Sequence, residues 1–217
     1  MITIDGNSGC GKSSTAKTVA SKLNYLYLDT GSMYRAVTLY FLNSGVNLNN
    51  ENEIHRALEQ VSIEFDRNDG LVMLNGKKVE AEIRGSKVSN HVSQVSAIPE
   101  VREKMVEIQR KIGSGKGVVM DGRDIGSIVL PDADLKFFMT ADLEVRSRRR
   151  LKELQEKNIG ASYEEVYQNL KNRDYQDTTR KVSPLIKPED AITIDTSNIT
   201  FQQQVNTIIN LVYQKIK

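Results

Sequence analysis

Short apolar runs alternate with stretches of helical periodicity along most of this chain. Five of the runs predict buried strands, at residues 2–5, 25–28, 118–121, 135–139 and 192–194. Parallel strands are joined by crossover connections that usually contain a helix. The alternation therefore predicts an α/β fold, with a five-stranded parallel sheet and helices on both faces.

The intervening stretches carry apolar residues at spacings of three and four, the pattern of amphipathic helices. Pro99 suits the first turn of one helix, and Ser162 and Glu165 form a capping box at the start of another. The predicted helices cover residues 14–23, 32–43, 51–60, 82–95, 100–112, 140–157, 162 to the basic end near 180, and 200–216.

Residues 63–80 interrupt the helical pattern with short alternating apolar runs. Asn68-Asp69-Gly70 and Asn75-Gly76 join these runs, and both are strong hairpin signals. The region predicts a small antiparallel β insertion of two or three strands. Because such a sheet is too small to have its own core, it must lean on the body of the protein or clamp over a ligand.

The bulk composition restricts the class of protein. The 217 residues suffice for one α/β domain, and 30 basic against 28 acidic residues give no global attraction to nucleic acid or membranes. There is one cysteine, no apolar run of membrane-spanning length and no export signal after Met1. We therefore expect a cytoplasmic protein with neither nucleic acid nor membrane as partner. A monomer is a separate expectation, which the composition does not establish.

One glycine-rich segment fits the phosphate-binding pattern G-x-x-x-x-G-K-[ST] without a gap, between a predicted strand and a predicted helix. Its glycines allow backbone N–H groups to turn toward phosphates, and the helix that follows adds partial positive charge. Lys12 would reach the β- and γ-phosphates, and Ser13 would offer its hydroxyl to Mg²⁺. Cys10 fills a variable position and is given no redox role. The segment predicts a P-loop NTPase fold, with the nucleotide bound by Gly6, Asn7, Ser8, Gly9, Cys10, Gly11, Lys12, Ser13 and Ser14.

A buried strand that ends in a carboxylate, here Asp121, is the arrangement that orients Mg²⁺ or its water shell beside a phosphate loop. Arg123 and Asp124 follow at once, and three charged residues in four next to an apolar strand are hard to explain as surface. We expect Ser13 and Asp121 at the metal, the latter directly or through water, and Arg123 and Asp124 at a ligand.

Two predicted helices place further polar residues beyond strand ends. Tyr34 and Arg35 lie in the first turn of the helix after the second strand, where open α/β sheets bind ligands. Taken alone, they are explained as well by a core aromatic and a solvated charge. Arg146, Arg149 and Arg150 share one helical face, without an interleaved carboxylate before residue 153. A phosphate-facing role is favoured for this face over a solvated one.

Arg173, Asp177 and Arg180 would stand on one helical stripe, at i, i+4 and i+7, if the helix continues that far. Two arginines held apart by a carboxylate suit a phosphate or ribose group. Residues 158–181 contain few large apolar side chains, and Gly160 joins the two helices of this segment. A mobile lid is the natural interpretation.

A P-loop, an aspartate at a strand end and arginines on separate helices are the parts of phosphoryl transfer between bound groups. A GTPase is disfavoured because no guanine-reading N-K-x-D segment follows a late strand. The alternatives that stay open are a kinase of another nucleotide or of a small metabolite, and a noncatalytic nucleotide-sensing module. Residues 113–117 are also glycine-rich, but they precede a strand and predict a flexible connector.

Several motifs beyond the phosphate loop are spread along the chain: Asp29-Thr30-Gly31-Ser32-Met33-Tyr34-Arg35, Glu82-Ile83-Arg84, Ser93-Gln94-Val95 with Pro99 and Val101-Arg102, Asp121-Gly122-Arg123-Asp124-Ile125-Gly126, and Arg173-Asp174 through Asp177 and Arg180. With these motifs, the chain resembles over essentially its whole length the bacterial cytidylate kinases, which phosphorylate CMP and dCMP with ATP and Mg²⁺. The insertion at residues 63–80 is similar to the enlarged monophosphate-binding insert of these enzymes.

The resemblance implies roles for individual residues. Thr30, where serine is equally expected, belongs to the implied CMP site, as does Asp121. The other implied CMP contacts are Ser93, Arg102 and Asp124 for cytosine, Arg35, Arg123 and Arg180 for the monophosphate, and Tyr34, Arg173 and Asp177 for the pentose. The implied catalytic residues are Lys12, Arg123, Arg149 and Arg180, of which Arg149 would also contact ATP.

The resemblance also divides the single domain, residues 1–217, into three parts. The core would comprise residues 1–30, 99–157 and 182–217. The monophosphate-binding region would comprise residues 31–98, and the lid residues 158–181.

Overall fold

The structure is a computed structural model that describes residues 1–66, 69–113, 115, 117–156 and 158–216. It forms two compact units. Unit 1 contains Met1–Tyr27 and Gly117–Lys217, and unit 2 contains Leu28–Lys116. Each unit has its own cluster of buried apolar side chains. The division into core, monophosphate-binding region and lid stays a prediction.

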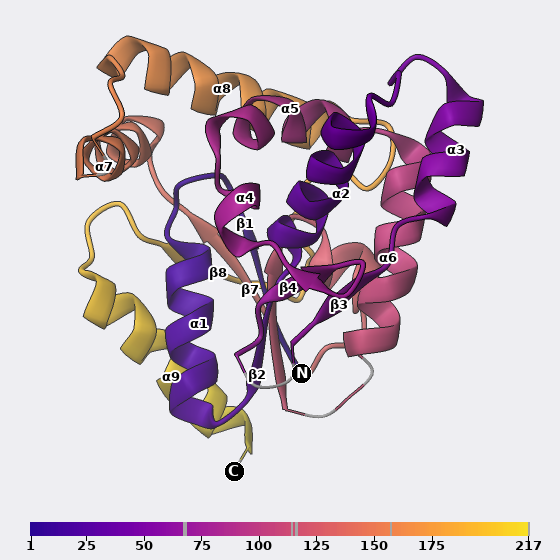
Figure 1. The fold of residues 1–217 in the computed structure, drawn as a ribbon. Helices are drawn as coiled ribbons and strands as arrows, with labels where there is room; N and C mark the ends of the chain where they lie inside the picture. The colour runs from indigo at the N-terminus through magenta and orange to yellow at the C-terminus, as the bar shows by residue number, and fades with distance from the viewer. Residues whose placement is uncertain (67–68, 114, 116, 157, 217) are drawn as a thin grey trace. The chain divides into compact units, whose positions relative to one another are not determined.

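Unit 1 is built on a five-stranded sheet in which β1 pairs with β6 and β7, and β7 with β8, all in parallel, as the alternating pattern predicts (Figure 1). The strand order is β2-β6-β1-β7-β8, and β2 begins in unit 1 and ends in unit 2. β1 pairs with β6 and β7 and is buried at every position, so both faces of the sheet are covered at its centre. The strands are β1 (Ile2–Gly6), β2 (Leu26–Asp29), β6 (Val118–Gly122), β7 (Leu135–Thr140) and β8 (Ile192–Asp195).

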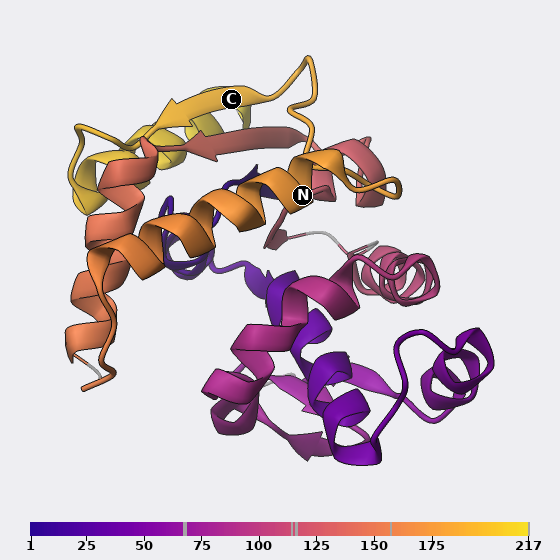
Figure 2. The same cartoon turned by 90° about the horizontal axis from the view of Figure 1, so that it is seen from above.

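The helices of unit 1 lie in neighbouring pairs. α1 (Lys12–Leu23) lies beside α9 (Phe201–Ile216), and both contribute to the buried cluster around the sheet (Figure 1). α7 (Leu143–Glu156) lies beside α8 (Tyr163–Thr179), which begins at the predicted capping box (Figure 2). One π-helical turn, η1 (Ile125–Val129), follows β6. The chain's N-terminal ammonium group, on Met1, pairs with Asp134.

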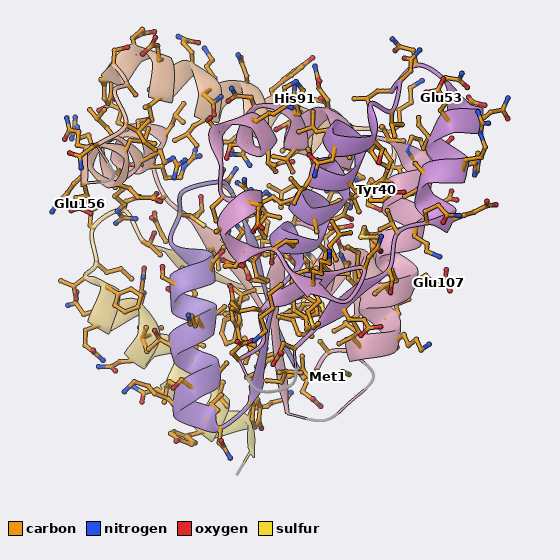
Figure 3. The ribbon with its side chains drawn as sticks, in the orientation of Figure 1. Met1, Tyr40, Glu53, His91, Glu107 and Glu156 are labelled. Atoms are coloured by element: carbon orange, nitrogen blue, oxygen red, sulfur yellow. The ribbon has the colours of Figure 1, made fainter. Side chains whose placement is uncertain are left out.

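Unit 2 combines helices with the predicted insertion. Its antiparallel sheet consists of β3 (Ile63–Phe65), β4 (Val72–Leu74) and β5 (Lys77–Lys78), which confirms the small β insertion. The buried side chains of β3 and β4 join the apolar cluster formed by the helices, so the sheet leans on its own unit. In Figure 3 the labels Tyr40, Glu53, His91 and Glu107 mark α2, α3, α5 and α6. The helices are α2 (Thr30–Ser44), α3 (Glu51–Glu59), α4 (Glu80–Ile83), α5 (Ser86–Ser96) and α6 (Pro99–Gly113).

The structure corrects two predicted helices. The helix expected over residues 82–95 is broken, because Gly85 is extended (φ −62°, ψ 158°) and separates α4 from α5. The helix expected from Thr140 begins at Leu143, since Thr140 still belongs to β7. Parts of three predicted features, at Asn68, Ser114, Lys116 and Lys157, lie outside the described residues.

Candidate active site

β1 runs directly into the glycine-rich loop, and α1 begins at Lys12. A side chain at Gly6 would have no room, because its Cβ would lie 1.9 Å from the carbonyl oxygen of Met139 on β7. Gly6 also has φ +150°, which favours glycine. The loop therefore leaves the sheet by a route open only to glycine, in the strand–loop–helix context that a phosphate loop requires.

Side chains from elsewhere in unit 1 hold the carbonyl groups of this loop. Arg146 Nη1 donates to Ser8 O at 3.1 Å, and Thr196 Oγ1 donates to Cys10 O at 3.0 Å. Lys12 Nζ donates to Asn7 O at 3.3 Å. These bonds fix the backbone of the loop, so its shape is preorganised for a ligand.

Lys12 is 7% exposed. Burial lowers the pKa of its ammonium group, and the positive charge of Arg123 lowers it further. Two cationic groups that interact in a dry site repel one another, and a polyanionic ligand between them would relieve that repulsion. The environment of Lys12 is thus suited to phosphate groups.

Asp121 is buried at the carboxyl end of β6, and both of its oxygens accept hydrogen bonds. Ser13 Oγ donates to Oδ2 at 2.7 Å, and the Tyr27 hydroxyl donates to Oδ1 at 2.8 Å. The structure therefore brings together Ser13 and Asp121, the two residues predicted at the metal. Tyr27 is an additional partner that the sequence patterns did not reveal.

Two arginines and two aspartates form a charge cluster in unit 1. Arg123 Nε donates to Asp177 Oδ2 at 2.7 Å, and Arg180 Nη1 donates to Asp177 Oδ1 at 3.3 Å. Arg180 Nη2 lies 3.9 Å from Asp124 Oδ1. Burial acts to raise the pKa of Asp177, but Arg123 and then Arg180 outweigh burial and hold that pKa below its usual value. Asp177 therefore stays ionised between two guanidinium groups.

The predicted helical stripe is wrong at its last member. α8 ends at Thr179, and Arg180 is extended with φ −60° and ψ 144°. The chain turns back because Leu185 N donates to Asp177 O at 2.7 Å, and Arg180 Nε donates to Ser183 O at 2.7 Å. Arg180 still reaches Asp177, but from a loop. Arg173 remains on α8, where its charge helps to lower the pKa of Asp177.

The arginine face of α7 acts on the phosphate loop. Arg146 is 5% exposed and pairs with Asp174 of α8 at 2.7 Å, in addition to its bond with the loop. Arg149 donates to both Thr196 Oγ1 and Thr196 O, so it fixes the residue that binds Cys10 O. Arg150 pairs instead with Glu153 at 2.7 Å. The expected convergence of three arginines is therefore wrong for Arg150.

In unit 2, the first turn of α2 is fixed by Asp29, whose Oδ1 accepts a hydrogen bond from Ser32 N at 3.1 Å. Its other oxygen pairs with Arg84 Nη2 at 2.9 Å. Thr30 is buried at the start of the same helix. Arg35 Nη1 donates to Ile83 O at 3.3 Å and to Ser89 Oγ at 3.0 Å. These contacts set the direction of Arg35 within unit 2.

Arg102 is only 1% exposed, although it carries a charge. Its guanidinium carbon lies 5.2 Å from the ring centroid of Tyr34, and Nη1 donates to Ser96 O at 3.0 Å. A cation over an aromatic face is favourable when water is excluded. Ser93 is half-buried on α5, and its carbonyl accepts a hydrogen bond from Ser96 Oγ. Unit 2 thus holds Tyr34, Ser93 and Arg102 among ordered partners.

Comparison with protein families gives a match over nearly the whole chain: the model described as "Cytidylate kinase" covers residues 2–214. The chain belongs to the cytidylate kinase family. A cytidylate kinase of Cytophaga hutchinsonii is 50% identical, with 100% of this chain and 94% of that protein aligned. A cytidylate kinase of Clostridium botulinum (strain Langeland) is 47% identical, over 97% of this chain and 96% of that protein.

Solved structures agree with this fold at much lower sequence identity. A shikimate kinase from Bacteroides thetaiotaomicron gives a TM-score of 0.51 at 14% identity, covering 98% of this chain and 97% of that chain. This likeness shows that the two chains share a fold. In the part of the chain that the structure describes, no helix combines the length and apolar character needed to cross a membrane.

In this member of the cytidylate kinase family, the sequence patterns assigned no individual role to Tyr27, Arg84 or Asp174, although Arg84 and Asp174 lie in motifs that carry the resemblance. Tyr27 binds Asp121, Arg84 binds Asp29, and Asp174 binds Arg146, which holds the phosphate loop. Each lies within or beside a motif, but periodicity and spacing report only on neighbours along the chain. Asp5, a carboxylate in an otherwise uncharged strand, was a local signal that could have been noticed.

Proposed function

We propose that this protein transfers the γ-phosphoryl group of ATP to CMP and dCMP, giving CDP and dCDP. Membership of the cytidylate kinase family over residues 2–214 carries the proposal. The phosphate loop and the buried arginines support it, because phosphoryl transfer depends on positioning and charge neutralisation. We further propose that the protein works as a cytoplasmic monomer without a nucleic acid or membrane partner.

Ser13 and Asp121 would hold Mg²⁺ beside the nucleotide, directly or through water. A hydroxyl and a carboxylate are the hard oxygen donors that suit this ion, and their oxygens lie 2.7 Å apart. When bound, the ion would neutralise charge on the β- and γ-phosphates. Ser13 and Tyr27 each hold one oxygen of the carboxylate, so its orientation is already fixed.

The remaining groups at ATP would be cationic. Lys12 would bind the β- and γ-phosphates, and Arg123, Arg149 and Arg180 would neutralise charge that moves with the phosphoryl group. Asp177 holds two of these arginines in place. It belongs to α8, in the proposed lid at residues 158–181. A lid that closes over bound substrates would keep water from the phosphoryl group.

The CMP contacts are likewise proposals that rest on the family resemblance. Arg35, Arg123 and Arg180 would bind the monophosphate, and Arg35 is already directed by Ile83 O and Ser89. The burial of Arg102 against Tyr34 supports a role in a dry base-binding site. The other proposed contacts are Ser93 and Asp124 for cytosine, Tyr34, Arg173 and Asp177 for the pentose, and Thr30 and Asp121 elsewhere in the site.

A coupled ADP-release assay with ATP and Mg²⁺ tests the proposal. The acceptor panel contains CMP, dCMP, UMP, AMP, GMP and several hydroxyl-bearing metabolites. We expect turnover to be led by CMP and dCMP. Turnover led by another acceptor, or by none, would contradict the proposed activity and favour a metabolite kinase or a nucleotide-sensing module.

Replacing Tyr27 by phenylalanine tests the proposed metal site. The variant lacks a hydroxyl that donates to Asp121, so we expect the Mg²⁺ concentration for half-maximal rate to rise about tenfold, in line with a bond to a charged group. The measurement is a Mg²⁺ titration at fixed ATP. Tyr25→Phe is the matched control, because the Tyr25 hydroxyl makes no hydrogen bond within the described residues. An equal Mg²⁺ requirement in both variants would argue against the site.

A further inference from the structure

Asp5 is a buried carboxylate that none of the roles above uses. It lies on β1 directly before the phosphate loop and is 1% exposed. In the sheet it stands opposite Gly122 of β6, the residue that precedes Arg123 and Asp124. A buried charge is costly unless hydrogen bonds or opposite charges compensate it. The partners of Asp5 therefore indicate what this residue does.

Both oxygens of Asp5 accept hydrogen bonds from the start of η1. Ile125 N donates to Oδ1 at 2.9 Å, and Gly126 N donates to Oδ2 at 2.7 Å. Burial raises the pKa of Asp5 to about 7, while these two N–H groups act in the opposite direction. Each oxygen thus has its own backbone donor, and the two bonds hold the carboxyl group against the start of η1. Asp5 thus fixes the backbone immediately after Asp124.

Asp124 occupies the N-cap position of η1, where an aspartate commonly accepts hydrogen bonds from the following backbone amides. Its side chain makes no such capping bond. Asp5, from the neighbouring strand, accepts from two of these amides instead. The Asp124 carboxylate is directed elsewhere, with Oδ1 3.9 Å from Arg180 Nη2.

Gly126 permits the close approach that this arrangement needs. A Cβ at Gly126 would lie 2.8 Å from Thr3 Oγ1 and 3.4 Å from Asp5 Oδ2. Any larger residue would push η1 away from β1 and lengthen the bonds to Asp5. Gly126 therefore leaves room for the hydrogen bonds that Asp5 accepts from the start of η1.

We propose that Asp5 is a positioning residue for nucleotide selectivity. By capping η1 from β1, it leaves the Asp124 carboxylate directed at the base of the monophosphate instead of at its own backbone. The inference rests on the proposed CMP kinase activity. Asp5 itself does not touch the substrate and acts only through Asp124.

The first test is Asp5→Asn, which keeps nearly the same shape. The NH₂ group of asparagine cannot accept a hydrogen bond, so one of the two backbone N–H groups would lose its acceptor. We expect the ratio of kcat/KM for CMP to that for UMP to fall about tenfold, the effect of one bond to a charged group. The KM for ATP should change less than about twofold. Thr3→Val is the control, since Thr3 Oγ1 is buried on the same strand without a hydrogen-bond partner among the described residues. An unchanged ratio in folded Asp5→Asn overturns the inference.

A double-mutant cycle separates positioning from general support of the fold. If Asp5 acts through Asp124, then Asp5→Asn adds no further loss of selectivity in an Asp124→Ala background. A full additional tenfold loss would contradict the inference. If Asp5 had a merely structural role, Asp5→Asn would lower the selectivity in both backgrounds and would also change the KM for ATP.

Hydrogen exchange tests the inference on the unmodified protein, so it does not depend on whether a variant folds. The amides of Ile125 and Gly126 should exchange slowly in the free protein because they donate to Asp5. Exchange at the rate of exposed loop amides would overturn the inference. Failure of the proposed function looks different: the unmodified protein would then show no preference for CMP, whatever the exchange rates of these amides.

Discussion

Replacing Arg180 by alanine is expected to lower kcat for CMP phosphorylation by about 10³-fold, the scale of one charge-stabilising arginine in phosphoryl transfer. The side chain is 7% exposed and makes defined contacts with Ser183 O and Asp177. A cation held in this way needs little reorganisation when charge develops on the transferring group. Because Arg180 would act mainly on that group, the KM for ATP should change much less than kcat.

Steady-state kinetics under saturating ATP and CMP measure the effect. Arg148→Ala is the matched control, since Arg148 is an exposed arginine of the same unit that pairs with Glu144. Arg180→Lys keeps the charge but not the planar fork and should give an intermediate rate. Thermal unfolding shows whether each variant is folded, and Asp177 retains Arg123 as a partner in all of them. A kcat for Arg180→Ala within a few-fold of the unmodified enzyme would remove Arg180 from the catalytic residues.

The parts of this fold that sequence predicts are those specified by neighbours along the chain. Asn75 has φ 48° and Gly76 has φ 76°, the left-handed values that an Asn-Gly hairpin turn requires. The capping box at Ser162 and the strand–loop–helix order around the phosphate loop are local in the same sense. In each case a few adjacent residues carry the whole signal.

The helix boundaries were predicted wrongly where a contact with a distant residue, or an overlooked glycine, ends the helix. The end of α8 depends on a hydrogen bond from Leu185 N to Asp177 O, which helical spacing does not reveal. The predicted helix therefore extended one residue too far and included Arg180. Gly85 was a local signal for the break between α4 and α5, and the apolar periodicity on either side obscured it.

The candidate site was predicted as a set of residue types, and its internal bonding was not. Motif spacing singled out Ser13 and Asp121, but the bond between them joins residues 108 positions apart. Likewise, Asp177 was expected to separate Arg173 and Arg180, and the structure pairs it most closely with Arg123. Which carboxylate neutralises which arginine is a property of the folded chain. The roles of these residues toward CMP remain predictions for kinetics to test.

Replacing Asp124 by alanine is expected to reduce the preference for CMP over UMP about a hundredfold or more, while leaving the KM for ATP nearly unchanged. Asp124 has a side chain only 4% exposed. An ionised carboxylate only accepts hydrogen bonds, so it suits the 4-amino group of cytosine. Uracil presents a carbonyl oxygen at that position, which would leave the buried carboxylate facing another acceptor. The discrimination therefore comes mainly from a penalty on UMP.

This origin predicts different results for two substitutions. Asp124→Ala removes the penalty on UMP together with the bond to CMP, so kcat/KM should rise for UMP, fall for CMP and become similar for the two substrates. Asp124→Asn offers an NH₂ donor to the uracil carbonyl, so kcat/KM for UMP should rise above its value in the unmodified enzyme. Asp132→Asn is the matched control, because it removes an exposed charge that follows η1 in the chain. A CMP preference that survives in Asp124→Ala would show that other groups read the base, and Arg102 would then be the next residue to replace.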